Sequence, residues 1–144
     1  MKEKMKKLRK NNKGFSLVEL IIVIAIMAIL IGVLAPQFIK YVNNSRVSTD
    51  VKNGQEIAAA ISAEVSDGTN ATYATTSATV EITADNKPSS IGTLPAVKYT
   101  KSGDSNWYAS WDVANGDVKV FCGGENAANQ VYPTDEYSAS RKSS

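Results

Sequence analysis

The N-terminal part of the chain is dominated by one long apolar run. Between Phe15 and Leu34, only Ser16 and Glu19 carry polar side chains. About twenty residues, at a rise of about 1.5 Å per residue, give a helix of roughly 30 Å, which is the hydrocarbon thickness of a bilayer. Residues 15–35 are therefore predicted to form a membrane-spanning helix.

A second, amphipathic pattern follows this run. Apolar positions recur alternately every four and three residues, which is the spacing of one helix face. The helix is predicted to cover residues 36–67 and to stop at Asp67-Gly68, because glycine favours the left-handed conformation at a helix end. Its apolar face is expected to pack on a C-terminal sheet. This face consists of Val47, Val51, Gly54, Ala58, Ile61 and Val65.

Two residues weaken the junction between these helical segments. Proline has no N–H, so Pro36 cannot donate a hydrogen bond to the carbonyl of Gly32, and glycine is itself a poor helix former. The sequence therefore predicts one weak helical turn between Gly32 and Pro36. In an isolated membrane protein this turn would be a modest kink.

Residues 68–144 are predicted to form a small β head domain. Alternating apolar and polar positions predict short strands at 79–83 and 97–100, followed by a hairpin. The Asn115-Gly116 dipeptide favours a two-residue type I′ turn in this hairpin. The side chains on one hairpin face are expected to cover the helix as core, which we favour over a ligand-stacking role for the tryptophans. This face carries Trp107, Ala109, Trp111, Val113, Val118, Val120 and Cys122.

The C-terminal segment 125–144 is mostly polar and is expected to be a loop that frays from Ser138 onward. Cys122 is the only cysteine, and the chain has no histidine. An intrachain disulfide is therefore excluded, as are Cys/His zinc sites and acid–base catalysis by histidine. We interpret Cys122 as a small buried strand residue. The sequence does not say what holds the last segment in place.

The carboxylates of the head do not form a recognisable catalytic or metal-binding pattern. Asp112 with Asp117, or Asp135 with Glu136, could contribute to a calcium site, but the chain lacks the run of oxygen ligands found in an EF-hand. We favour solvated carboxylates near turns. The sequence thus predicts no catalytic residue, no metal and no cofactor, and the protein is not expected to be an enzyme.

Glu19 is an unusual residue for a membrane span. An acidic residue at the centre of a span opposes insertion by about 2.5 to 3.5 kcal/mol, and this cost falls toward the helix ends. If the chain were cut between Gly14 and Phe15, the new amine of Phe15 would lie four residues before Glu19, one helical turn away on the same face. The cut would supply a cation for the carboxylate.

The residues around this bond carry a family resemblance. With a basic leader before them and Pro36 after them, they resemble the class III signal of type IV pilins and related pseudopilins: Lys13-Gly14-Phe15-Ser16-Leu17-Val18-Glu19-Leu20. The scarcity of cysteine is similar to that of pilins from Gram-positive bacteria. The resemblance implies the pilin fold, an α+β arrangement in which a long N-terminal helix packs on a small antiparallel sheet.

The resemblance also implies a processing route. A prepilin peptidase would remove the leader, residues 1–14, by cutting between Gly14 and Phe15, and would methylate the amine of Phe15. Glu19 would then guide assembly by attracting the Phe15 amine of a neighbouring subunit. Loss of the leader leaves nine basic and thirteen acidic side chains, a net charge of −4. The mature chain therefore offers no basic surplus for nucleic-acid binding.

By this resemblance the chain is a structural subunit of a type IV pilus, a surface filament for motility, adhesion or biofilm formation. The precursor would cross the inner or cytoplasmic membrane once, with its basic N-terminus in the cytoplasm. In the filament, the weak turn at Gly32 and Pro36 would be melted.

The implied partners are other copies of the chain, the peptidase that also methylates it, and an assembly platform with its ATPase. One alternative is a pseudopilin of a type II secretion or competence system. Another is a single-pass anchored binding domain or enzyme whose leader is never cut.

Overall fold

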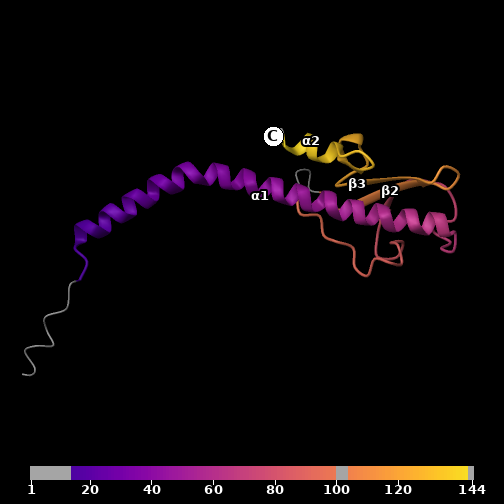
Figure 1. The fold of residues 1–144 in the computed structure, drawn as a ribbon, viewed down its shortest axis with the longest axis horizontal. Helices are drawn as coiled ribbons and strands as arrows, with labels where there is room; N and C mark the ends of the chain where they lie inside the picture. The colour runs from indigo at the N-terminus through magenta and orange to yellow at the C-terminus, as the bar shows by residue number, and fades with distance from the viewer. Residues whose placement is uncertain (1–13, 100–103, 143–144) are drawn as a thin grey trace, which may run out of the picture. The chain divides into compact units, whose positions relative to one another are not determined.

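The computed structural model describes residues 14–99 and 104–142 (Figure 1). The predicted leader, apart from Gly14, lies outside these residues. In chain order the elements are α1 (Leu17–Asp67), β1 (Ser77–Ile82), β2 (Trp107–Asp112), β3 (Asp117–Cys122), the short 3-10 helix η2 (Ala127–Asn129), β4 (Gln130–Tyr132) and α2 (Glu136–Lys142). The sheet has the strand order β1-β2-β3-β4, and all neighbouring strands are antiparallel. This α+β arrangement confirms the predicted fold class and is consistent with the pilin fold.

The helix α1 is continuous through both Gly32 and Pro36. It ends where the sequence predicts, because Gly68 adopts a φ of +65° and its N–H donates to the carbonyl of Glu64 at 3.0 Å. All the apolar positions predicted to face the sheet are buried. Three further residues on α1 are also buried although the apolar pattern did not include them: Asp50, Ile57 and Glu64. The chain divides into two compact units, one ending at Ile39 and one beginning at Lys40.

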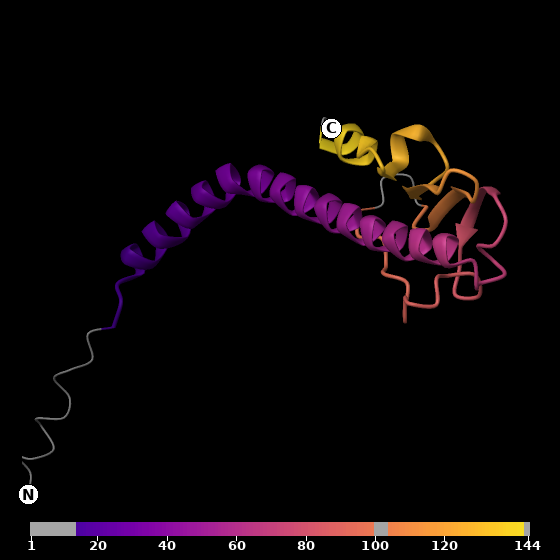
Figure 2. The same ribbon diagram turned by 45° about the vertical axis from the view of Figure 1, so that its right-hand side comes forward.

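The second half of α1 lies beside the sheet (Figure 2). The hydrophobic core of the C-terminal unit contains residues of both. The predicted hairpin face is buried at every strand position, from Trp107 to Trp111 on β2 and from Val118 to Cys122 on β3. Val113 lies beyond the end of β2 and is 39% exposed. Both tryptophans are core residues, as predicted. Their indole N–H groups donate to loop carbonyls, Trp107 to Pro95 at 2.7 Å and Trp111 to Thr75 at 2.8 Å.

The hairpin turn differs from the predicted type I′ geometry. Asp112 pairs with Asp117, so four residues form the loop, and the N–H of Gly116 donates to the carbonyl of Asp112 at 2.8 Å. Gly116 has a φ of +72°, but Asn115 does not have a positive φ, whereas a type I′ turn needs positive φ at both central residues. A two-residue turn would pair Trp111 with Val120, two positions away from its observed partner. Because the shift is two residues, the same side chains still face the core.

The connection between β1 and β2 follows α1 closely, and two buried carboxylates hold it there. β1 confirms the strand predicted at 79–83, but residues 97–99 of the second predicted strand are not a strand, and Thr100 lies outside the described residues. The N–H groups of Lys98 and Tyr99 instead donate to the carboxylate of Asp50 at 2.7 and 2.8 Å. These donors are therefore not available to a sheet partner.

Glu64 holds the other end of this connection. Its carboxylate accepts hydrogen bonds from the N–H and the hydroxyl of Ser89, and from the side-chain amide of Asn70. Glu64 is 8% exposed and Asp50 is 0% exposed. Three donors surround each carboxylate, which is the condition under which a buried acid is tolerated.

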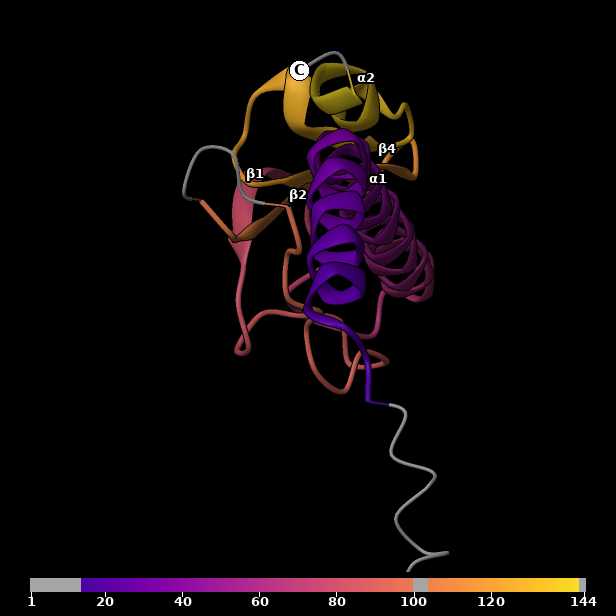
Figure 3. The same cartoon turned by 90° about the vertical axis from the view of Figure 1, so that its left-hand side faces the viewer.

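The C-terminal segment is not the frayed loop that the sequence predicts, as far as Lys142; Ser143 and Ser144 lie outside the described residues. This segment forms α2, which lies against β4 and η2 (Figure 3). The side chain of Tyr137 is fully buried, and its hydroxyl lies 2.9 Å from Oδ2 of Asp50 and 3.0 Å from the carbonyl of Tyr99. The guanidinium of Arg141 lies 4.3 Å from the centre of the Tyr137 ring and donates to Oδ1 of Asn129 at 2.8 Å. We call Asp50, Tyr99, Tyr137 and Arg141 the C-terminal clasp, because they hold the last segment without a disulfide.

At Gly54, α1 approaches the side chains of the sheet closely. A Cβ atom at this position would overlap Cγ2 of Val131 and lie 3.1 Å from Cζ3 of Trp107. Gly54→Ala is therefore expected to lower the free energy of unfolding by about 2 kcal/mol, the usual cost of overpacking a core. Gly32→Ala is the matched control, because a Cβ there would meet no atom of the described residues within 4 Å other than its chain neighbours and the adjacent helix backbone.

Thermal unfolding of the full chain in detergent, followed by the near-ultraviolet signal of the two buried tryptophans, measures this effect. The Gly54 variant should melt earlier than the Gly32 variant. Equal melting temperatures would show that the core can accommodate the methyl group.

Candidate functional site

The segment that contains the predicted cleavage site precedes the helix. Gly14, Phe15 and Ser16 are not helical, and the first backbone hydrogen bond of α1 runs from the N–H of Leu20 to the carbonyl of Ser16 at 3.2 Å. Phe15 is 93% exposed. The helix thus begins two residues later than predicted, and the Gly14–Phe15 peptide bond lies outside it. Phe15 and Glu19 are therefore not one turn apart on a helix face in this structure.

Glu19 has a partner that the sequence analysis missed. The N–H of Ser16 donates to Oε2 of Glu19 at 3.0 Å, and the N–H of Glu19 donates to Oγ of Ser16 at 3.2 Å. This reciprocal arrangement is a capping box, in which two side chains satisfy backbone donors at a helix start. The signal was present in the sequence as Ser-x-x-Glu directly before an apolar run. The carboxylate also lies at the helix N-terminus, where the helix dipole favours negative charge.

The N-terminal unit exposes an almost wholly apolar helix surface. Glu19 is its only charged residue between Phe15 and Ile39. Among the described residues, α1 is the one helix long and apolar enough to cross a membrane, and its most apolar stretch has no buried residue. Beside Glu19 is a groove of about 580 Å³, whose other walls are Phe15, Leu20, Ile22 and Val23. An exposed apolar surface of this extent is typical of a site that contacts lipid or other protein chains.

The two residues of the predicted weak turn lie on this exposed part of α1. Pro36 is inside the helix, and a Cβ at Gly32 would meet no atom of the described residues within 4 Å other than its chain neighbours and the adjacent helix backbone. The helix is not interrupted at either residue. Melting of this turn in a filament stays a prediction.

Two of the carboxylates considered for a calcium site, Asp112 and Asp135, accept hydrogen bonds from nearby residues. Oδ1 of Asp112 accepts hydrogen bonds from the hydroxyl of Thr76 at 3.1 Å and from the N–H of Ala114 at 3.0 Å. Its Oδ2 accepts from the side-chain amide of Asn115 at 2.9 Å. Asp135 caps α2 by accepting the N–H of Ser138 at 2.8 Å. No group of three or more His, Cys, Asp or Glu residues close enough to hold a metal occurs in the described ranges.

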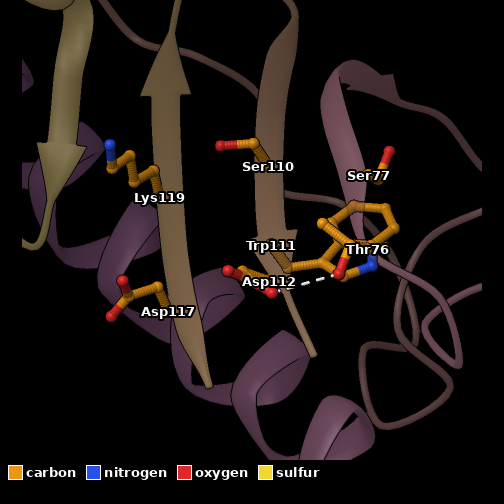
Figure 4. A pocket seen from close by; sticks show the side chains of 7 residues that line it. All are labelled: Thr76, Ser77, Ser110, Trp111, Asp112, Asp117 and Lys119. Atoms are coloured by element: carbon orange, nitrogen blue, oxygen red, sulfur yellow. Dashed lines mark hydrogen bonds between the residues drawn. The ribbon is translucent and has the colours of Figure 1, made fainter. Parts of the chain in front are cut away.

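A polar depression of about 230 Å³ lies over the solvent-facing side of the hairpin (Figure 4). Its lining residues come from the start of β1 and from β2 and β3: Thr76, Ser77, Ser110, Trp111, Asp112, Asp117 and Lys119. Lys119 and Ser110 lie on paired positions of neighbouring strands, and Asp112 and Asp117 form the pair two positions nearer the turn, on the same face of the sheet.

Cys122 is fully buried beside the C-terminal clasp. Burial raises the pKa of its thiol to about 12, although a hydrogen bond with Tyr137 acts in the opposite direction. Burial likewise raises the pKa of Tyr137. Both groups are neutral at physiological pH. The interpretation of Cys122 as a small buried strand residue is confirmed.

Comparison with known proteins identifies the N-terminal segment. Residues 9–35 match the family described as the prokaryotic N-terminal methylation motif, and the match ends before the amphipathic half of α1. No curated protein and no solved structure is significantly similar to the chain. The match includes the non-helical Gly14–Phe15 bond, the capping box of Ser16 and Glu19 and the exposed apolar helix. Residues 9–35 therefore carry a prokaryotic N-terminal methylation motif, a class III signal peptide that is consistent with a type IV pilin-like prepilin.

Proposed function

We propose that this chain is the precursor of a type IV pilus subunit. It would be cut between Gly14 and Phe15, methylated on the amine of Phe15 and polymerised into a surface filament. The observation that carries this proposal is the methylation motif on a helix whose exposed surface is apolar except for Glu19. An uncovered apolar helix attached to a folded head is suited first to a membrane and then to a bundle of identical helices.

Assembly would use the one charge in this apolar segment. The amine released at Phe15 is a cation, and in surroundings of low dielectric constant the Glu19 carboxylate of an incoming subunit would attract it strongly. Each subunit would then leave the lipid, and its helix would exchange lipid contacts for contacts with other helices. Energy for extraction would come from a cytoplasmic ATPase acting through a membrane platform.

The weak turn of α1 would have its role in the same step. Pro36 deprives the carbonyl of Gly32 of its helical donor, so this turn is the easiest one to melt. Melting would let the head and the apolar helix adjust independently as subunits pack. The precursor would be located in the inner or cytoplasmic membrane and the assembled form outside the cell.

N-terminal sequencing and mass spectrometry of protein sheared from cells test the proposal. We expect a chain that begins at N-methylated Phe15. A product that begins at Met1 would refute it. A chain that is cut but stays in the cell envelope would point to a pseudopilin of a secretion or competence system.

Substitution of Gly14 tests the position of the cut. A bulky residue, as in Gly14→Leu, should block cleavage, so the gel shift of about 1.5 kDa that accompanies leader loss should disappear. Gly14→Ala should be largely tolerated, because a single methyl group adds little bulk at a site that accepts glycine. Equal processing of the Leu variant and the wild type would place the cut elsewhere.

A further inference from the structure

The capping box determines where α1 begins, and therefore which carbonyl groups accept helical hydrogen bonds. If the helix began one turn earlier, the N–H of Glu19 would donate to the carbonyl of Phe15, and the N–H of Val18 would donate to the carbonyl of Gly14. In the structure, Oγ of Ser16 takes the N–H of Glu19 at 3.2 Å. The Ser16 hydroxyl thus takes the place of the Phe15 carbonyl as acceptor, and α1 begins at Leu17.

The second hydrogen bond of the box reinforces this boundary. Oε2 of Glu19 accepts the N–H of Ser16 at 3.0 Å, so this donor is satisfied without a further helical turn. With Ser16 as the cap, the residues before it remain outside the helix. Those residues are Gly14 and Phe15, whose peptide bond is the proposed site of cleavage.

We propose that the capping box presents the Gly14–Phe15 bond to the prepilin peptidase, with Ser16 and Glu19 as positioning residues for the cleavage. This inference rests on the proposed function.

Hydrolysis of the Gly14–Phe15 bond consumes one water molecule. The water oxygen bonds to the carbonyl carbon of Gly14, and the bond from that carbon to the nitrogen of Phe15 breaks. The water's two protons end on that nitrogen, which leaves as an ammonium group, while Gly14 keeps a carboxylate. The carbonyl must be open to attack for this step.

A helix that included residue 14 would oppose the reaction in two ways. Its carbonyl would be hydrogen bonded to Val18, and the neighbouring turn would crowd the carbonyl carbon. Near the lipid, where few water molecules can satisfy a free N–H, loss of the Ser16 hydroxyl favours such an extension, since the Phe15 carbonyl is the next acceptor for Glu19. Alanine at position 16 adds the strongest helix former.

The test uses the full-length precursor in detergent with a prepilin peptidase, and follows the rate of leader release by mass spectrometry. Ser16→Ala should lower kcat by roughly fivefold, which is the factor by which loss of an N-cap typically shifts a helix equilibrium, with a smaller change in KM. Ser16→Thr keeps the hydroxyl and should restore the rate to within about twofold. Ser48→Ala, at an exposed helix position remote from the motif, should be cleaved like the wild type.

Glu19→Gln distinguishes the effect of the capping box from the effect of the negative charge at residue 19. Glutamine at this position can still accept the N–H of Ser16, so this variant should be cleaved at the wild-type rate. Hydrogen exchange at the amides of Val18 and Glu19 gives an independent readout, because Ser16→Ala should slow exchange at Val18 if the helix extends.

Three results would overturn the inference: wild-type kinetics in Ser16→Ala, a Ser16→Thr variant as slow as Ser16→Ala, or a slow Glu19→Gln variant. These results are distinct from failure of the proposed function, in which the wild-type precursor itself would not be cut.

Discussion

Glu19→Gln is expected to leave the chain processed and membrane-inserted but to abolish its incorporation into filaments. The substitution removes the charge and keeps the size of the side chain and its capping role. Two opposite charges about 4 Å apart attract by about 4 kcal/mol at an effective dielectric constant of about 20, which corresponds to roughly a thousandfold in an equilibrium constant. Without this attraction, the incoming subunit would lose its means of recognising the Phe15 amine.

Shearing of cells followed by immunoblotting of filaments and membranes measures the effect. We expect mature-length protein in the membrane fraction and none above background in the filament fraction. Glu56→Gln is the matched control, because Glu56 is exposed on the amphipathic half of α1 and lies outside the methylation motif. Normal filaments from the Glu19 variant would remove the proposed role of this carboxylate.

Asp50→Ala is expected to have the largest effect on the stability of the head. The substitution leaves the N–H groups of Lys98 and Tyr99 without their acceptor and removes one of the two acceptors near the Tyr137 hydroxyl. A buried donor without a partner costs about 1–3 kcal/mol, so the free energy of unfolding should fall by about 3 kcal/mol or more. In a domain of this size, such a change lowers the melting temperature by roughly 15 °C.

Thermal unfolding of the full chain in detergent, monitored by near-ultraviolet circular dichroism, tests this expectation. Tyr137→Phe removes only one donor and should cost about 1–2 kcal/mol. Glu56→Ala is the control for removing an exposed acid from the same helix. If Asp50→Ala had the same melting temperature as this control, the C-terminal clasp would not stabilise the head.

The parts of the fold that depend on periodicity could be predicted. The helix stripe from Val47 to Val65 and the buried face of the hairpin follow from periods of about 3.6 and 2, and both are found in the structure. The type I′ turn was wrong because the Asp112 side chain and carbonyl organise a four-residue loop, a preference that the Asn-Gly pair alone does not reveal.

The buried acids could not be predicted in the same way. Asp50 is buried because its donors come from residues 98, 99 and 137, far along the chain, and local pattern does not show which N–H groups will meet it. The frayed tail was wrong for the same reason, since Tyr137 and Arg141 are ordered by contacts with distant residues. The capping box of Ser16 and Glu19 is different, because its spacing is local and was visible in the sequence.

The two hydrogen bonds by which the Asp50 carboxylate holds the connection between β1 and β2, here called the Asp50 clamp, affect how this protein can evolve. At Lys98 and Tyr99 the carboxylate holds main-chain N–H groups, not side chains. Lys98 is exposed, so mutation can change its size or charge while the clamp persists, and proline, which has no N–H, is the substitution that the clamp forbids. The surface here is thus free to diversify over a conserved backbone path.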